Sequence, residues 1–147
     1  MKLLWHYTTG VHFKKIVAAG ALIPYVTGDL APGERRGVWF STEQFWEPTA
    51  QKGWTENGVK SSLGMTGTQE KAGGLIRIGV GRDQMVFVPF DEYAKTIPQQ
   101  WAAGLRREAR KHGANCKKHF VTYEPVPREL WAAVEMFNGR RWEGVLL

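Results

Sequence analysis

An imidazole, hydroxyls and a carboxylate, residue types that take part in acid–base and electrostatic catalysis, lie in the first third of the chain. His6 lies near the end of the apolar segment Leu4-Trp5-His6-Tyr7-Thr8-Thr9. A second segment, residues 37–42, reads Gly-Val-Trp-Phe-Ser-Thr and is followed by Glu47. A fixed carboxylate can stabilise developing positive charge and take a proton from an attacking acceptor. The carboxylate candidates for that role are Glu47 and, later in the chain, Glu124 and Glu135.

Several common catalytic motifs are missing from the sequence. No Gly-x-Gly-x-x-Gly follows a predicted strand, and the chain has neither a P-loop nor a Gly-x-Ser-x-Gly turn. The four histidines lack the His-Glu-x-x-His spacing of helical zinc proteases. One cysteine excludes an internal disulfide and a cysteine-rich zinc site. We therefore expect no metal centre.

Basic residues are concentrated between positions 106 and 118, where Glu108 is the one acidic residue. They complement the C-terminal end of a predicted helix, so they fit either a solvated helix face or a phosphate-binding surface. The net charge of +6 favours a polyanionic partner over an acidic protein. A nucleic acid, DNA or RNA, is the partner this segment predicts, through Arg106, Arg107, Arg110, Lys111, Lys117 and Lys118.

Length and composition indicate one folded domain spanning residues 1–147. The 147 residues include seven tryptophans and seven phenylalanines, too many for a disordered chain. No run of about 18 apolar residues is present, so no membrane span is expected. The apolar stretch near the first residue is too short for a secretory signal. Together with the single cysteine, this favours a cytoplasmic location.

Apolar runs bounded by turn residues predict strands at 2–8, 38–41, 75–80, 85–90, 119–123 and 141–147, with a short extended piece at 21–25. Residues 27–36 read as a loop. Residues 43–74, with few aliphatic side chains, read as a turn of helix and a long mobile loop.

Three helices are predicted from apolar spacing and capping residues. The first follows a Thr9 N-cap and ends at Gly20. The second begins at Pro98, carries the stripe Trp101, Leu105 and Ala109, and ends at Gly113. The third begins at Pro127, turns Leu130, Trp131, Val134 and Phe137 inward, and ends at Gly139. Because helices and strands do not alternate regularly, the fold class is α+β.

The two N-terminal segments carry a family resemblance. A histidine ending a first strand, a helix leading to Gly20-Ala21-Leu22-Ile23-Pro24, and then Val38-Trp39-Phe40-Ser41-Thr42 resemble the front half of the ADP-ribosyltransferase superfamily. The nearest clades are the His-Tyr-Glu group, the DarT-type nucleic-acid ADP-ribosyltransferases and the RNA 2′-phosphotransferases. The resemblance covers about the first 50 residues closely and the last 70 as a strand–helix pattern. It implies a split pair of small, mostly antiparallel sheets with flanking helices and NAD in the cleft between them.

The resemblance also implies roles for individual residues. His6 would hydrogen-bond the ribose next to nicotinamide, with Tyr7 and Thr8 following it into the cleft. Ser41 and Thr42 match small hydroxyl positions of the family. Arg35, Arg36 and Arg77 are available as a clamp for the pyrophosphate, and Arg35 and Arg36 are preferred because they lie in the loop before the second strand. Trp39, Phe40, Trp46 and Trp54 are candidates to stack on nicotinamide, and Trp46 is preferred because it lies on a loop.

In the family the catalytic glutamate lies on a late strand, and the matching position here falls near Lys118 or His119, neither of which is a carboxylate. Glu124, just beyond that strand, is the first candidate, and Glu47 is the second. The predicted function is ADP-ribose transfer from NAD to a macromolecule, with nucleic acid favoured by the charge. Two alternatives stay open: a non-catalytic module of this fold that binds a nucleotide or nucleic acid, and an NAD-dependent RNA 2′-phosphotransferase.

Overall fold

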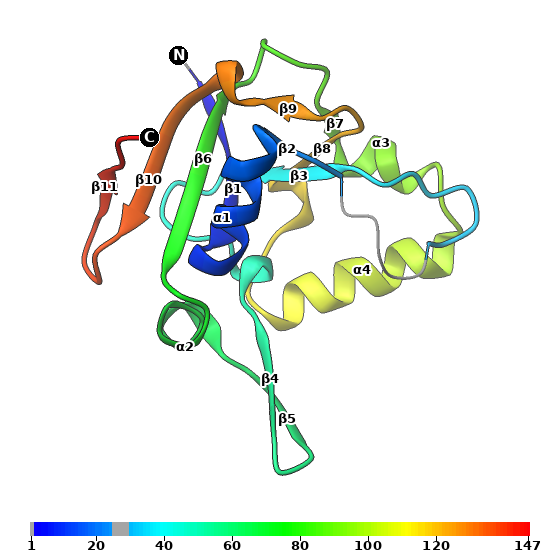
Figure 1. Cartoon of the computed structure of the whole chain (residues 1–147). Helices are drawn as coiled ribbons and strands as arrows, with labels where there is room; N and C mark the ends of the chain where they lie inside the picture. Colours follow the sequence, from blue (N-terminus) through cyan, green and yellow to red (C-terminus); the bar gives the residue numbers. More distant parts are fainter. Residues whose placement is uncertain (1, 25–29) are drawn as a thin grey trace.

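A seven-stranded sheet, antiparallel between all neighbours, forms the centre of the computed structural model, which describes residues 2–24 and 30–147 (Figure 1). The strand order is β11-β10-β6-β1-β3-β8-β7. All seven residues of β6 are buried. The strands are β1 (Leu3–Thr9), β3 (Val38–Ser41), β6 (Leu75–Gly81), β7 (Val88–Pro89), β8 (His119–Thr122), β10 (Trp131–Phe137) and β11 (Trp142–Gly144).

Two pairs of short strands and several helices surround this sheet. β2 (Ala21–Leu22) pairs with β9 (Val126–Pro127), and β4 (Gly53–Glu56) pairs with β5 (Val59–Ser62) in a hairpin that extends away from the body of the molecule (Figure 1). The α-helices are α1 (Gly10–Ala19), α2 (Gly64–Lys71), α3 (Phe90–Ala94) and α4 (Gln99–Lys111). The 3-10 helices are η1 (Pro48–Ala50), η2 (Cys116–Lys118) and η3 (Arg128–Leu130).

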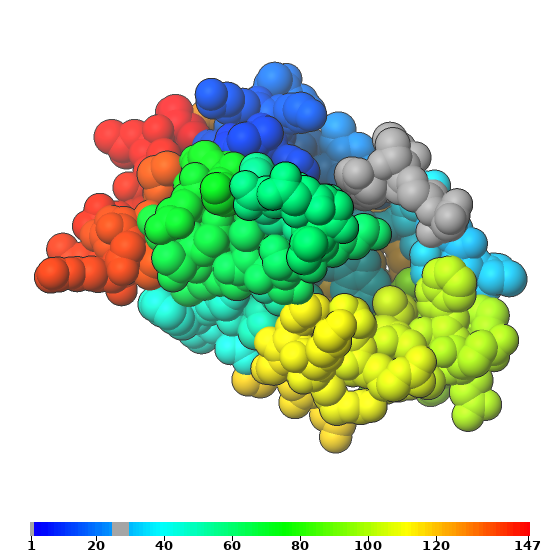
Figure 2. All heavy atoms as spheres, turned by 90° about the horizontal axis from the view of Figure 1, so that it is seen from below, coloured from blue at the N-terminus to red at the C-terminus, as the bar shows by residue number. Residues whose placement is uncertain are grey.

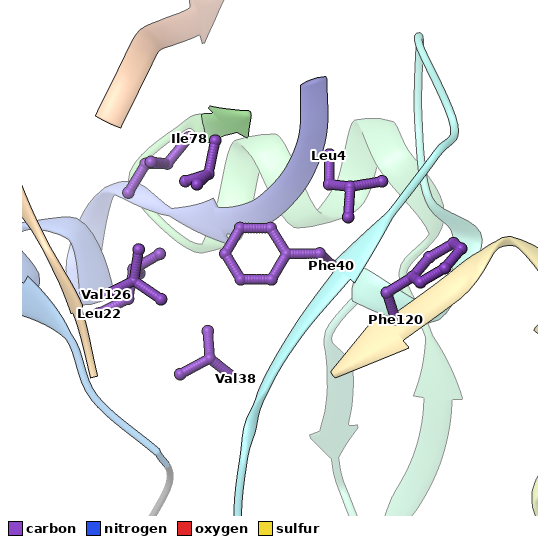
Figure 3. Packing of buried hydrophobic residues seen from close by; sticks show 8 residues of the cluster. Leu4, Leu22, Val38, Phe40, Ile78, Phe120 and Val126 are labelled. Carbon is purple, nitrogen blue, oxygen red and sulfur yellow. The ribbon is translucent and has the colours of Figure 1, made fainter. Parts of the chain in front are cut away.

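The main core lies where β1, β3, β6 and β8 meet the β2–β9 pair. Apolar side chains from these five parts pack together there, which removes a continuous apolar surface from water (Figure 3). A second cluster lies between the helices α3 and α4 and strand β8, and it includes Phe90, Tyr93 and Val121. The main cluster consists of Leu4, Leu22, Val38, Phe40, Ile78, Val80, Phe120 and Val126.

The α+β class and the antiparallel pairing are confirmed, as are most predicted elements. Thr9 caps α1 by accepting from the backbone N–H of His12, and Gly20 ends α1 in the left-handed conformation. The strands expected at 2–8, 38–41, 75–80 and 119–123 form with shifts of one residue at their ends. Residues 25 and 27–29 of the expected extended piece and loop lie outside the described residues.

The helix predicted after Pro127 is wrong. One turn of 3-10 helix is followed by strand β10, which pairs with β6 so that Glu135 lies opposite Arg77 and Val134 opposite Ile78. Apolar residues three and four positions apart suggested a helix, but the buried strand β6 needs a partner on its second edge, and that pairing decides the structure.

The long mobile loop predicted at 43–74 is also wrong. It folds into η1, the β4–β5 hairpin and α2. Asn57 and Gly58 at the hairpin tip both have positive φ, 51° and 77°, as a two-residue hairpin turn requires. The Asn-Gly dipeptide is the sequence signal for this turn.

Three smaller corrections concern residues 85–90, 141–147 and α4. Only Val88–Pro89 and Trp142–Gly144 form strands in the first two segments, and Phe90 already begins α3. In α4, Ala102 and Ala109 are buried, whereas Trp101 and Leu105 are exposed. Of the stripe expected to face inward, Ala109 alone is buried, and Ala102 is the α4 residue that packs in the second cluster.

Candidate active site

The sheet opens between β1 and β3. These strands share the registered pair Trp5–Ser41, whereas β1 pairs with β6 along its whole length. Two cavities, of about 190 and 850 Å³, adjoin this opening. Both are lined by His6, Tyr7, Trp39 and Thr49. The expected split into a pair of small sheets is therefore not found, because β1 and β3 join the two halves in one seven-stranded sheet, but their pairing is short at the point where the sequence places its candidate residues.

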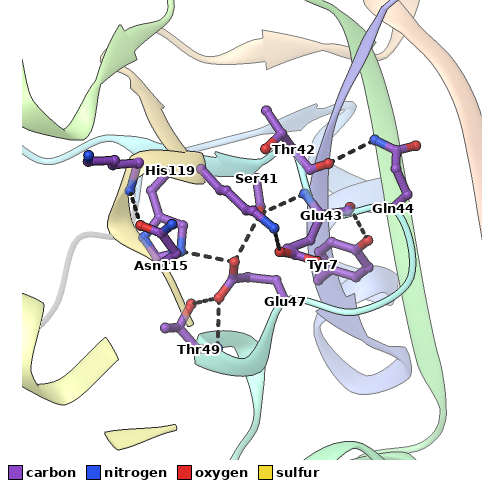
Figure 4. Close-up of polar contacts among 11 residues, drawn as sticks. Tyr7, Ser41, Thr42, Glu43, Gln44, Glu47, Thr49, Asn115 and His119 are labelled. Carbon is purple, nitrogen blue, oxygen red and sulfur yellow. Dashed lines mark hydrogen bonds and ion pairs between the residues drawn. The ribbon is translucent and has the colours of Figure 1, made fainter. Parts of the chain in front are cut away.

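The smaller cavity contains a buried carboxylate held by four hydrogen bonds (Figure 4). Glu47 is 6% exposed. Its Oε1 accepts from Oγ of Ser41 and from Nε2 of His119, both at 2.9 Å. Its Oε2 accepts from the backbone N–H of Thr49 at 2.9 Å and from the Thr49 hydroxyl at 2.6 Å. The N–H contact caps η1, in which Pro48 takes the first position.

These donors determine the charge of Glu47. Burial alone would raise the pKa of the carboxyl, but the hydrogen bonds from His119 and Thr49 outweigh it and lower the pKa from 4.5 to about 2. The carboxylate is ionised at neutral pH, and Nε2 of His119 must carry the proton in their hydrogen bond. All four acceptor sites of the carboxylate are used. Glu47 therefore acts as a fixed negative charge and not as a proton acceptor.

His6 bridges the gap between the two strands. Its Nδ1 lies 2.7 Å from the backbone carbonyl of Trp39, and because a carbonyl only accepts, Nδ1 is the protonated nitrogen. Burial lowers the pKa of His6, and the nearby charge of Lys52 lowers it further. The ring is neutral at pH 7, so Nε2 is an acceptor. Every buried side-chain nitrogen and oxygen in the described ranges has a hydrogen-bond partner. Since Nε2 of His6 has none, this atom is not fully buried and is accessible to a ligand.

Two lysines and a histidine line the larger cavity on the α1 side. His12, Lys15 and Lys52 border it together with Ile16 and Ala19, which share one face of α1 with His12 and Lys15. Lys52 acts on both histidines, since its charge lowers the pKa of His6 and of His12. This end of the cavity suits an anionic group such as a phosphate.

The predicted clamp residues Arg35 and Arg36 are not among the residues found to line either cavity. The guanidinium of Arg35 lies over the ring of Tyr123, 4.2 Å from its centroid. Arg36 precedes Gly37, which does line the larger cavity. The cations that the structure brings to the cavity come instead from α1 and from Lys52.

The other predicted binding residues divide into two groups. Thr8 lines the larger cavity and Ser41 the smaller one. Thr42 faces neither cavity; its backbone N–H donates to the carbonyl of Lys118 at 3.0 Å. Trp46 packs edge-on against Tyr7, with ring centroids 5.6 Å apart, and Trp39 is the tryptophan that lines both cavities. Of the two adjacent aromatics on β3, Trp39 is 36% exposed and Phe40 is 2% exposed.

The three candidate carboxylates occupy very different surroundings. Glu124 is exposed, beyond the end of β8 opposite to the end that carries His119. Glu135 lies on β10 and pairs with Arg77, with 2.6 Å between Nη2 and Oε1. Glu47 is the candidate that lines a cavity together with His6.

The basic segment borders a separate notch of about 250 Å³ between α4 and η2. Arg106, Arg110 and Lys117 line it, and Asp91 pairs with Arg106 at 3.2 Å. Arg107 and Lys111 are exposed elsewhere on α4, which lies on the molecular surface (Figure 2, yellow). Lys118 forms an ion pair with Glu43. Lys117, which lines the notch, precedes His119, the partner of Glu47, by two positions in the sequence.

His119 and Thr49 are site residues that no sequence motif selected, as are His12, Lys15 and Lys52 of the larger cavity. One local signal for Thr49 existed, because Glu-Pro-Thr is a pattern in which the first residue caps a helical turn. The spacing of His12, Lys15, Ile16 and Ala19 on one helix face was a second signal. No local pattern links Glu47 to His119, which lie 72 positions apart.

No protein-family model matches the chain, and no curated protein or solved structure matches it either. Among residues 2–24 and 30–147, no helix combines the length and apolar character needed to cross a bilayer. The same residues contain no group of three or more histidine, cysteine, aspartate or glutamate side chains that could hold a metal ion.

Proposed function

We propose that this chain transfers ADP-ribose from NAD to a nucleophilic acceptor. The observation that carries the proposal is the hydrogen bond between Glu47 and His119. The family resemblance puts the catalytic carboxylate near position 118 or 119, where this sequence has none. The carboxylate of Glu47, from the segment after β3, lies 2.9 Å from Nε2 of His119. A carboxylate is therefore present at that place in the fold, supplied from another part of the chain.

The cavities support NAD as the donor. The larger volume, about 850 Å³, lies within the range of roughly 300–1,000 Å³ usual for small-molecule sites. Lys15 and Lys52 suit the pyrophosphate, and the face of Trp39 suits the cationic nicotinamide ring. The neutral His6 offers Nε2 as an acceptor for a ribose hydroxyl. In this arrangement nicotinamide and its ribose lie near the strand gap and the phosphates lie toward α1.

The residues of the smaller cavity have distinct tasks in this reaction. NAD supplies the electrophilic ribose carbon, whose bond to nicotinamide breaks as the bond to the acceptor forms, so that nicotinamide leaves as a neutral molecule. Glu47 holds a negative charge next to the ribose, where positive charge develops. Because Glu47 is saturated with donors, the acceptor's proton passes to an imidazole of the site, His6 or His119.

The acceptor that the charge favours is a nucleic acid. Arg106, Arg110 and Lys117 surround the notch beside η2, and η2 leads directly into His119. A phosphodiester backbone held there lies close to the Glu47–His119 pair. Phosphate contacts of this kind position a strand without reading its sequence.

The proposal is tested by following nicotinamide release from NAD, with and without single-stranded DNA or RNA. Removing a charge that acts in the transition state lowers turnover more than affinity, so Glu47→Gln should reduce kcat by about 100-fold and leave NAD binding nearly unchanged. Glu124→Gln, which removes an exposed carboxylate outside both cavities, is the matched control and should behave as wild type.

Three results would count against this assignment. Wild-type activity in Glu47→Gln would remove the carboxylate from the mechanism. A wild-type protein that binds NAD or nucleic acid and releases no nicotinamide would instead indicate the non-catalytic binding module. Transfer of an RNA 2′-phosphate, detected as loss of that phosphate from the RNA, would indicate the phosphotransferase alternative.

A further inference from the structure

The segment that leads from β3 to Glu47 is held through its own backbone. We call residues 42–46 the site loop. Three consecutive carbonyls of this loop accept side-chain hydrogen bonds from distant strands. The carbonyl of Glu43 accepts from the hydroxyl of Tyr7 at 2.6 Å, that of Gln44 accepts from Nη1 of Arg77, and that of Phe45 accepts from Nε1 of Trp142 at 2.8 Å.

The donors come from three strands of one half of the sheet, β1, β6 and β11. Arg77 is 8% exposed and lies between two tryptophan rings, 3.9 Å from the centroid of Trp5 and 4.7 Å from that of Trp142. Oε1 of Glu135 accepts a hydrogen bond from Nε of Arg77 at 2.8 Å and forms an ion pair with Nη2 of the same guanidinium. A guanidinium held between rings and fixed by a carboxylate has little freedom to turn, and its Nη1 donates to the carbonyl of Gln44 and, at 3.5 Å, to the hydroxyl of Tyr7.

The side chains of the site loop are partly buried or exposed, and its aromatic rings make edge-on contacts, Phe45 with Phe137 and Trp46 with Tyr7. Gln44 and Phe45 are exposed, and the side chain of Gln44 bonds back to Trp5 and to the loop at Thr42. Backbone carbonyl contacts hold the path of a loop whatever side chains it carries. The donors of β6 and β11 are thus two of the contacts that hold the path of the loop, which leads to Glu47.

We propose that Arg77 and Trp142 are positioning residues that place the Glu47 carboxylate against His119, through the carbonyls of Gln44 and Phe45. Neither side chain lines the cavities that hold Glu47 and His6. The part of this inference that concerns turnover rests on the proposed function. The structural part, the link between these donors and the Glu47 contacts, does not.

The test uses two tryptophans that each donate one indole N–H to a backbone carbonyl. Trp142→Phe keeps an aromatic ring against Arg77 and removes the bond to Phe45. Trp131→Phe is the matched control, because Nε1 of Trp131 donates to the carbonyl of Val126 at 3.1 Å, away from the site loop. Arg77→Lys is the second test variant, since an ammonium keeps the charge but lacks the planar fork. Thermal unfolding confirms that each variant is folded.

Two measurements are made on each folded variant. The first is hydrogen exchange of the Thr49 amide, which donates to Glu47 and so reports the carboxylate's position without any substrate. We expect exchange about 10-fold faster or more in Trp142→Phe and Arg77→Lys, and unchanged in Trp131→Phe. The second is nicotinamide release, for which we expect kcat to fall by roughly 10- to 100-fold at an unchanged KM for NAD.

The outcomes separate the two proposals. Faster Thr49 exchange in the test variants, without a change in Trp131→Phe, supports the positioning role even if the wild type releases no nicotinamide, in which case the proposed function alone fails. Thr49 exchange within about twofold of wild type in both test variants overturns the positioning role, whatever the activity. An equal effect in Trp131→Phe also overturns it, because the loss would then reflect general destabilisation.

Discussion

Glu47 and His119 are 72 positions apart in the sequence, yet Oε1 of the first lies 2.9 Å from Nε2 of the second. The pair joins the segment that leaves β3 to the first residue of β8, and these two strands are paired antiparallel with Ser41 opposite His119. Ser41 also donates to the same oxygen of Glu47, so one strand register brings three side chains together. The charge of Glu47 therefore depends on the pairing of β3 with β8.

The pH dependence of stability should reflect Glu47. Its pKa is lowered from 4.5 to about 2 in the folded protein, so its contribution to the free energy of unfolding is fully present above pH 4.5 and is lost as the pH falls toward 2. In urea unfolding, the stability difference between wild type and Glu47→Gln should shrink over this range. The same comparison with Glu124→Gln should stay small at every pH. A Glu47→Gln difference that is constant with pH would contradict the lowered pKa.

His6→Ala should weaken NAD binding without unfolding the protein. Loss of one polar partner in a buried site costs about 1–3 kcal/mol, which corresponds to a rise in Kd of roughly 5- to 150-fold. Isothermal titration calorimetry measures the change. His112→Ala is the control, since His112 bonds to Gln51 and Glu108 and lines neither cavity. Equal NAD affinity in wild type and folded His6→Ala would remove His6 from the ligand site.

Lys52→Met should weaken binding of ligands that carry phosphates. We expect the Kd for NAD and ADP-ribose to rise about tenfold or more, and the Kd for nicotinamide riboside to stay the same. NMR titration gives an independent readout, because removing the positive charge should raise the pKa of both His6 and His12. Lys60→Met, on the exposed hairpin, should change neither quantity. An equal loss of affinity for nicotinamide riboside would argue against a phosphate contact at Lys52.

The notch beside η2 should bind single-stranded nucleic acid in a salt-dependent way. The logarithm of the association constant should fall with the logarithm of salt concentration, by about 0.7 per phosphate neutralised. Changing Arg110 and Lys117 together to Glu should weaken binding similarly for all sequences and flatten this slope. The control with the same change in charge replaces Lys60 and Arg140, which are exposed elsewhere. Equal losses in the two double variants would indicate a general charge effect and no specific notch.

Gly10→Ala should destabilise the junction between β1 and α1. A Cβ at Gly10 would lie 2.0 Å from the backbone carbonyl oxygen of Gly73, so the backbone must shift. We expect a loss of about 1–3 kcal/mol in the free energy of unfolding. Gly104→Ala in α4 is the control with the opposite sign, because its Cβ meets only the end of the Arg107 side chain and alanine favours a helix by about 1 kcal/mol. Unchanged stability in Gly10→Ala would show that this contact relaxes freely.

Local sequence signals predicted the elements whose structure is decided locally. Thr9 and Gly20 bound α1 because one supplies a capping hydroxyl and the other adopts a positive φ of 73°. The apolar residues of β6 predicted a strand for the same reason, whereas the burial of Arg77 within it depends on Glu135 of β10. The β4–β5 hairpin was predictable from Asn57-Gly58 and was missed.

Long-range pairing decided the parts that the sequence did not reveal. β10 has the apolar spacing of a helix and becomes a strand because β6 has an open edge and Arg77 needs Glu135. The candidate site follows the same rule. His6, Tyr7 and Ser41 could be selected from two adjacent motifs, whereas the contact of Glu47 with His119, and the access of Lys52 to the cavity, arise only from the fold.

The hydrogen bond from Trp142 to the carbonyl of Phe45 also affects when the site can form during synthesis. A nascent chain that has reached residue 118 already contains His6, Ser41 and Glu47, but it lacks both His119 and the indole that holds the site loop. Such a chain leaves the ribosome without an assembled site, and it stays so until β8 and then β11 have been made. The topology thus delays the last contact of the site loop until translation has passed residue 142.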